Sequence, residues 1–239
     1  LCTIECCFAH TLDDASCEKN VALMADLADW SEICDRIYVW DYATNYANTL
    51  GIFPDFGVLQ RNVQIFYEHN VVGLYEEGNY YMAACDGEFG ELRAYLLSKL
   101  MQNPYLDYSA ETDAYLNGVY GPGGRYIREF IDIMTKHAVT DIQHLYIYQS
   151  TAQTLYGMTK KDIERCNQLW EDAKAQAQTE EQLAQLERSE LCWRYWKCSN
   201  RKGEFSLWQF PYVWMNANEK LHHDMKDMGI TMLGEGATH

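Results

Sequence analysis

Three short apolar segments near the start of the chain alternate with helical patterns. The segments are Thr3–Ala9, Ile37–Tyr42 and Val71–Tyr75, and they begin at the evenly spaced residues 3, 37 and 71. Between them, apolar residues recur at helical spacing from Leu23 to Cys34 and from Leu59 to Phe66. Strand, helix and strand at this interval predict the βα units of a parallel sheet.

The rest of the chain is predominantly helical. Apolar faces and capping residues predict helices beginning near Asp86, Ser109, Pro122, Thr159, Thr179 and Asn216, and a further strand at Ile142–Tyr148. The pairs Thr179 with Gln182 and Asn216 with Glu219 have the spacing of a capping box. Gly229 suits the residue that follows the last helix.

These elements define the expected fold class, α/β. Four strands are too few for a closed (β/α)₈ barrel, which needs eight strands in about 250 residues. We expect residues 1–150 to form the C-terminal half of a TIM-like parallel β/α barrel, with an α-helical region at residues 151–239 packed on it. Its partner would be the missing N-terminal half of the parent barrel. The alternative is a small open α/β sheet covered by helices.

Composition narrows the possible partners. The chain of 239 residues is 48% hydrophobic and 23% charged, which is typical of a folded globular protein. Its net charge of −16 at pH 7 repels phosphate backbones, so we expect no nucleic-acid partner. No apolar run approaches the roughly 18 residues that span a bilayer. The nine cysteines are irregularly spaced and lie mostly in apolar stretches, which predicts mainly reduced core residues.

Candidate chemistry lies where the early strands end, because ligands of parallel α/β folds bind at the carboxyl ends of strands. Adjacent carboxylates directly after an apolar strand are costly to bury without a role, and aromatic rings can stack on sugars. The candidate catalytic residues are Glu76, Asp41 and Glu77, and the candidate substrate-binding residues are Glu5, His10, Trp40, Tyr42, Asn45, Tyr46, Asn79 and Tyr80. We expect one concave surface to gather them. The alternative reading is a solvated loop at Glu76 and Glu77 with core aromatics around it.

Between the two adjacent acids, strand alternation favours Glu76, which shares a face with Val72 and Leu74. Glu5 is either an inward-facing site residue or the partner of a buried cation.

The cysteines near the N-terminus are spaced in the sequence like metal ligands, but strand geometry does not favour a shared site. Cys2, Cys6 and Cys7 are close to His10 in the sequence. In a strand, however, Cys6 and Cys7 point to opposite faces, so they do not readily share one tetrahedral site. We therefore expect neither a metal site nor a cofactor.

Several segments resemble a bacterial family called domain of unknown function 4838, over roughly the first 135 residues. They are Leu1–His10, Tyr38–Phe56, Val71–Tyr81, Gly87–Leu97 and Leu116–Ile131. Members of that family are attached to glycoside-hydrolase-like barrels. The resemblance implies a carbohydrate-active protein that acts on or binds bacterial, plant or host glycans, with Glu76 or Glu77 as the nucleophile if Val71–Tyr75 is about the seventh barrel strand. The competing class is a non-catalytic glycan-binding or structural module. The family setting implies the cell envelope or the exterior, whereas the cysteines favour a reducing interior.

Overall fold

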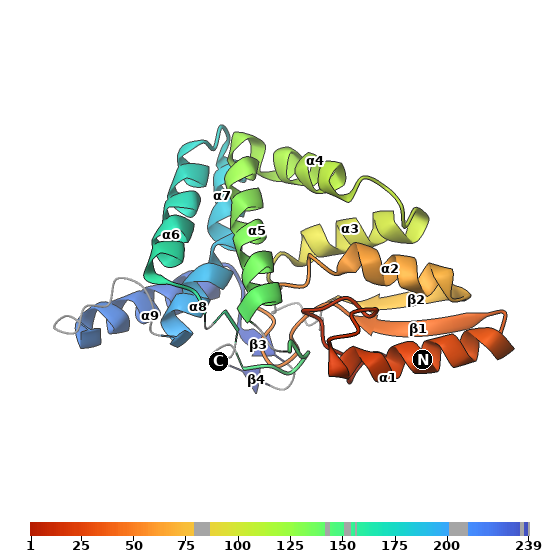
Figure 1. The fold of residues 1–239 in the computed structure, drawn as a ribbon. Helices are drawn as coiled ribbons and strands as arrows, with labels where there is room; N and C mark the ends of the chain where they lie inside the picture. The colour runs from red at the N-terminus through yellow and green to blue at the C-terminus, as the bar shows by residue number, and fades with distance from the viewer. Residues whose placement is uncertain are drawn as a thin grey trace.

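The computed structural model describes residues 1–78, 87–141, 144–150, 154–155, 157–200, 210–234 and 237–238 (Figure 1). Within these ranges the protein is a mostly helical α/β structure with a small parallel sheet. Strands β1 (Ile37–Tyr42) and β2 (Val71–Glu77) run parallel, and β3 (Met232–Gly234) pairs antiparallel with β4 (Ala237–Thr238). The described ranges therefore hold a two-stranded parallel sheet and not the expected half-barrel.

Helices make up most of the remaining structure. They are α1 (Glu18–Ile33), α2 (Leu59–Glu68), α3 (Gly90–Gln102), α4 (Tyr108–Tyr120), the 3₁₀ turn η1 (Gly121–Gly123), α5 (Gly124–Asp141), α6 (Lys160–Ala175), α7 (Glu180–Ser189), α8 (Leu191–Asn200) and α9 (Phe210–Asp227). Figure 1 shows β1 and β2 with α1 and α2 on one side of the molecule and the stack of α4 to α7 on the other. No helix among the described residues is both long and apolar enough to cross a bilayer.

The predicted strand Thr3–Ala9 is wrong. The first residues do extend the sheet, since Cys2 forms an isolated parallel bridge with Trp40 and the N–H of Thr3 donates to the carbonyl of Trp40. The chain then turns, because the N–H of Cys6 donates back to the carbonyl of Thr3 at 2.8 Å. The third parallel strand is thus reduced to one bridge.

The predicted strand Ile142–Tyr148 is also wrong over its described part, residues 144–148. This segment forms a turn that bonds to other loops: the N–H of Phe8 donates to the carbonyl of Leu145, and the N–H of Tyr46 donates to that of Ile147. Its backbone groups are therefore satisfied by single contacts to two different loops, and no strand partner is needed.

Local signals placed several helix ends correctly. Thr159 caps α6 in a full capping box with Asp162, and Thr179 caps α7. The helix expected to continue from Thr179 is broken at Glu190 into α7 and α8. The predicted start at Asn216 is wrong, because this residue lies inside α9.

Starts elsewhere differ from the predictions by a few residues. Helix α4 is capped by Asp107, whose side chain accepts the N–H of Ala110, rather than by Ser109. The N-cap of α3 is Phe89, while the predicted cap Asp86 lies outside the described residues. Gly229 adopts the positive φ of 78° that favours glycine after a helix.

Two apolar cores hold the molecule together. The smaller one packs Ile37 and Val39 of β1 against Leu27 of α1 and against Ile65 and Phe66 of α2. The larger one fills the helical stack and contains three fully buried tryptophans, Trp170, Trp193 and Trp196. The apolar periodicity that predicted α1 and α2 therefore places both helices on the same face of the sheet.

Candidate functional site: two faces at the ends of β1 and β2

The parallel sheet has two chemically different faces. Along β1, residues Ile37, Val39 and Asp41 are buried, and Tyr38 and Trp40 between them are exposed. The strand register places Asp41 opposite Glu76, Trp40 opposite Tyr75, and Tyr42 opposite Glu77. Residues that are directly paired in a sheet share a face. The two adjacent acids of the sequence therefore point to opposite faces.

Asp41 and Glu76 form what we call the inner acidic pair. Asp41 is buried, and the Thr3 hydroxyl donates a hydrogen bond to its Oδ1. Burial raises the pKa of Asp41 to about 6, against the lowering effect of the Thr3 hydrogen bond. Burial, and then the negative charge of Asp41, raise the pKa of Glu76 well above its usual range. Within the described part of the chain, Glu76 Oε2 is buried without a hydrogen-bond partner.

Asp55, Glu88 and Arg93 form a buried ionic cluster. Arg93 Nε donates to both oxygens of Asp55, at 2.9 and 3.1 Å, and its NH2 group contacts Glu88 Oε2 at 2.8 Å. All three side chains are almost fully buried, and the guanidinium also lies 4.5 Å from the ring centroid of Phe56. Burial raises the pKa of Glu88 to about 7, and the positive charge of Arg93 opposes that rise.

The cluster and the pair belong to one electrostatic unit. The negative charge of Asp55 contributes to the raised pKa values of both Asp41 and Glu76. Among the described residues, the carboxyl groups of Asp41, Asp55 and Glu88 are buried together with the guanidinium of Arg93, and Glu76 is partly buried beside them. Like charges in a poorly hydrated interior disfavour ionisation, which is the direction of the raised pKa values of these acids.

The opposite side of the sheet forms what we call the outer aromatic face. Its members Tyr38, Trp40 and Tyr75 are 62%, 49% and 57% exposed. Trp40 lies edge-on to Tyr75 at 5.2 Å, and its Nε1 donates to Glu77 Oε2 at 2.7 Å. A Cβ at Gly73 would come within 2.3 Å of the Tyr38 ring, so the missing side chain leaves room for that ring on the sheet. These rings form a solvent-exposed aromatic surface in which the hydrogen bond to Glu77 fixes the orientation of Trp40.

Besides Trp40, two predicted binding residues lie within this face or at its border. Tyr42 stacks with Trp40 at 6.3 Å between ring centroids, and Tyr46 meets Tyr42 edge-on at 5.8 Å. The hydroxyl of Tyr46 donates to the backbone carbonyl of Glu77 at 2.9 Å. Tyr46 is buried, so its role here is to support the exposed rings.

The other predicted binding residues are placed differently. Glu5 is exposed on the turn that replaces the expected strand. Asn45 is buried and organises its loop, since its Oδ1 accepts the N–H of Ala47 and its Nδ2 donates to the carbonyl of Gln149. His10 contacts Cys7, with 3.3 Å between Nδ1 and Sγ. Asn79 and Tyr80 lie outside the described residues. The structure thus distributes the candidates over several places, where the sequence predicts one concave surface.

Sequence reasoning missed Thr3, Asp55, Glu88 and Arg93 as members of the site. Asp55 and Arg93 are 38 residues apart, and neither follows a predicted strand. The only local sign was Asp55 itself, an acid within an otherwise apolar stretch, residues 50–59.

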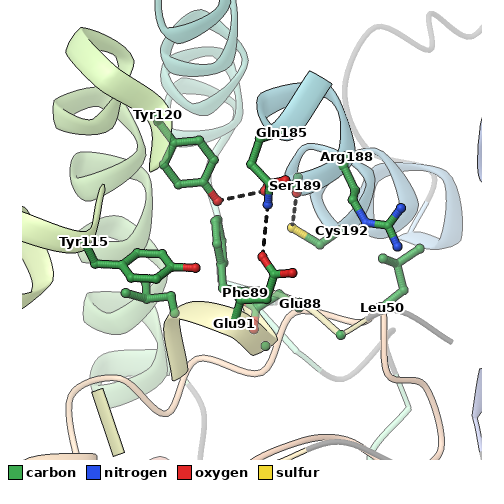
Figure 2. A pocket seen from close by; sticks show the side chains of 13 residues that line it. Leu50, Glu88, Phe89, Glu91, Tyr115, Tyr120, Gln185, Arg188, Ser189 and Cys192 are labelled. Atoms are coloured by element: carbon green, nitrogen blue, oxygen red, sulfur yellow. Dashed lines mark hydrogen bonds between the residues drawn. The ribbon is translucent and has the colours of Figure 1, made fainter. Parts of the chain in front are cut away.

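A small cavity, which Glu88 of the ionic cluster helps to line, lies between the start of α3 and the helices α4, α7 and α8 (Figure 2). Its volume of about 30 Å³ is room for one or two water molecules and not for a sugar ring. The Tyr120 hydroxyl and Ser189 Oγ lie 2.8 Å apart at its wall, and Gln185 Nε2 donates to Glu91 Oε2. None of the predicted site residues lines it.

Fold and site together define a mostly helical α/β protein whose parallel strand ends carry the buried Asp41 paired with the partly buried Glu76 on one face and exposed aromatic rings on the other. The family model described as Domain of unknown function (DUF4838) matches residues 1–132, more than half of the chain. The chain therefore belongs to this family, as its sequence segments had indicated. No curated protein and no solved structure matches the chain.

Proposed function

We propose that this chain is part of a carbohydrate-active, glycoside-hydrolase-like protein in which Asp41 and Glu76 are the acid–base pair. The observation that carries the proposal is their direct pairing at the carboxyl ends of two parallel strands. Ligand sites of parallel α/β folds lie at such strand ends.

The chemistry of glycoside hydrolysis supports this assignment. One carboxylic acid must protonate the leaving oxygen while a second, ionised carboxylate acts as base or nucleophile. Environments that push the pKa values of two neighbouring acids apart provide both roles. The raised pKa of Glu76 suits the proton donor, and Asp41, with a pKa of about 6, is largely ionised at neutral pH. This reasoning replaces the sequence-based preference for Glu76 as nucleophile.

The half-barrel belongs to the same proposal. The resemblance to domains attached to glycoside-hydrolase-like barrels supports it, as does the parallel pairing of β1 and β2. In this proposal the N-terminal half of the parent barrel supplies further strands, and residues 151–239 form the helical region packed on residues 1–150.

A non-catalytic glycan-binding module is the second candidate. The outer aromatic face favours it, because exposed rings can stack on sugar faces and the hydrogen bond from Trp40 to Glu77 fixes the indole. In this reading Trp40 and Tyr75 bind the ligand, and the inner acidic pair contacts none.

The deciding experiment screens the full-length protein for cleavage and binding of oligosaccharides, including uronic-acid glycans. For a cleaved substrate we expect Glu76→Gln to lower kcat by about 10²–10⁴-fold, as loss of a general acid does. Glu77→Gln, its neighbour on the opposite face, is the matched control and should keep kcat within a few-fold. Unchanged kcat in Glu76→Gln would refute the acid role. Binding without cleavage, abolished by Trp40→Ala, would establish the second candidate.

A further inference from the structure

Four potential metal ligands from distant parts of the chain converge at one place. The ligand atoms of Cys7, His10, Cys17 and His144 all lie within 4.8 Å of one another. Both cysteines are buried, and both histidines are partly buried. We propose that these four residues form a structural zinc site, which goes beyond the proposed glycan chemistry and does not depend on it.

The distances fit a tetrahedral ion. Zinc lies about 2.3 Å from thiolate sulfur and about 2.0–2.1 Å from imidazole nitrogen, so tetrahedral geometry separates sulfur and nitrogen ligands by about 3.6 Å. Cys7 Sγ lies 3.3 Å from His10 Nδ1, and Cys17 Sγ lies 3.8 Å from His144 Nδ1. Each pair is within about 0.3 Å of the tetrahedral value. These two pairs already have tetrahedral spacing, and the other separations, which extend to at most 4.8 Å, must shorten by up to about 1 Å when the ion binds.

The loop that carries the first two ligands is held in shape by Asn20. This fully buried side chain accepts the N–H of Cys7 and donates to the carbonyls of Cys7, His10 and Thr11, at 2.8–3.2 Å. One amide thus fixes both ends of the Cys7-to-His10 turn, and the ligands are positioned by the backbone of the protein.

The backbone positions the two sulfur atoms. The N–H of Leu145 points at Cys7 Sγ, at 3.4 Å. Cys17 occupies the N-cap of α1. Its side chain makes no capping hydrogen bond and instead lies beside His144. Cysteine is not a preferred N-cap residue, so a ligand role accounts for its presence better than capping does.

The carboxylate of Glu18 lies near the imidazole of His144. Glu18 Oε1 lies 3.9 Å from His144 Nε2, on the side of the ring opposite the Nδ1 that faces Cys17. Metal-bound histidines commonly direct their second nitrogen to a carboxylate, and Glu18, which lies beyond hydrogen-bond distance, attracts this nitrogen electrostatically. This arrangement leaves Nδ1 of His144 free to bind the ion.

The donor set points to zinc and to a structural role. Two thiolates and two imidazoles in tetrahedral array are a closed zinc site with no open position for substrate. The ion would join the loop before α1 to the segment at residues 144–146, and Cys17 and His144 are 127 residues apart. Cys6, although adjacent to Cys7, belongs to the smaller apolar core and not to the cluster. The sequence analysis considered only residues that are close together in the chain, namely Cys2, Cys6, Cys7 and His10. It missed the site because Cys17 and His144 approach the others only in the folded protein.

The test measures metal content in the full chain purified without added chelator. We expect about one zinc per chain, lost in Cys17→Ser and in His144→Ala but retained in the control Cys34→Ser, a cysteine outside the cluster. Cobalt added to the metal-free protein should give the visible bands of tetrahedral cobalt and the near-ultraviolet band of thiolate ligation. Removal of the metal should lower Tm by roughly 5 °C or more, and zinc should restore it.

Three results would overturn the proposal. The first is absence of zinc from wild-type protein that also fails to bind cobalt tetrahedrally. The second is full zinc content in both Cys17→Ser and His144→Ala. The third is a Cys7–Cys17 disulfide in the native protein, found by mass spectrometry. If Cys17→Ser does not fold, His144→Ala, at the partly exposed ligand, provides the same readout.

Discussion

Replacing Asp41 by asparagine should stabilise the protein at neutral pH. The substitution keeps the shape of the side chain and an oxygen to accept the Thr3 hydroxyl, but the amide cannot ionise. In the native protein the pKa of Asp41 is about 6 against an ordinary 3.8, because the carboxyl is buried. The folded state therefore holds this proton more tightly than the unfolded state does. Protonated Asp41 therefore adds to the free energy of unfolding below about pH 4, and this added stability is lost as the pH rises through 6.

The magnitude follows from the two pKa values. A tenfold difference in proton affinity is about 1.4 kcal/mol, so the rise from 3.8 to about 6 amounts to about 3 kcal/mol at pH 8. The difference in the free energy of unfolding between Asp41→Asn and wild type should be near zero at about pH 4 and should reach a plateau above about pH 6. For a chain of this size the plateau corresponds to an increase in Tm of about 6–12 °C.

The assay is urea or thermal unfolding of both proteins from about pH 4 to about pH 8. Asp14→Asn is the control of opposite sign, because the hydrogen bonds from Ser16 lower the pKa of Asp14. That variant should lose stability at neutral pH and not at low pH, where the carboxyl is protonated in both states. A difference for Asp41→Asn that does not depend on pH, or destabilisation at neutral pH and above, would refute the assignment of a buried carboxyl group with a raised pKa. An increase in stability that accompanies loss of activity would fit a residue retained for function.

Three further substitutions test the ionic cluster and two contacts in the helical part of the protein. Arg93→Met leaves the buried carboxylates of Asp55 and Glu88 without their cation and should destabilise by about 3–5 kcal/mol in urea unfolding, whereas a loss below about 1 kcal/mol would contradict the ionic cluster. Gly124→Ala places a Cβ 2.5 Å from the Leu116 carbonyl and should cost about 1–3 kcal/mol. Gly118→Ala, in open space on α4, is its control and should stabilise by about 0.5–1 kcal/mol; equal effects on Tm would count against the close helix contact. Thr159→Ala removes the capping box of α6 and should cost about 1 kcal/mol, with Thr159→Ser close to wild type; an equal loss in both would argue against capping.

The features that were predicted correctly from the sequence include helix starts, which depend on residues close together in the chain. The apolar periodicity of α2 and the capping box of α6 depend on residues within one or two turns, and both helices begin where expected. The predicted strand at Thr3–Ala9 failed for a non-local reason. The buried Asn20 captures the backbone around Cys7 and satisfies it in a turn, which an apolar pattern alone does not reveal.

The inner acidic pair depends on one irregularity of register. The register shifts between Ile37 and Tyr38, so that Tyr38 pairs with Gly73 and Asp41 pairs with Glu76. Without that shift Asp41 would lie opposite Tyr75, and the two acids would fall on different faces. Alternation along each strand was predictable, but the alignment of one strand with the other was not, since the sequence carries no marker for the shift.

Because the chain is synthesised from its N-terminus, the loop after β1 is made long before its hydrogen-bond partners. The loop after β1 receives backbone partners from far downstream: the N–H of Thr49 donates to the carbonyl of Leu233, 184 residues later, and that of Tyr46 to Ile147. At about 5–20 residues per second, a ribosome needs about 10–40 s to pass from the first of these positions to the last. During that interval the nascent segment that carries the whole family match, residues 1–132, lacks these partners. Contacts of such long range form slowly, so the loop after β1 acquires its native hydrogen bonds late in folding.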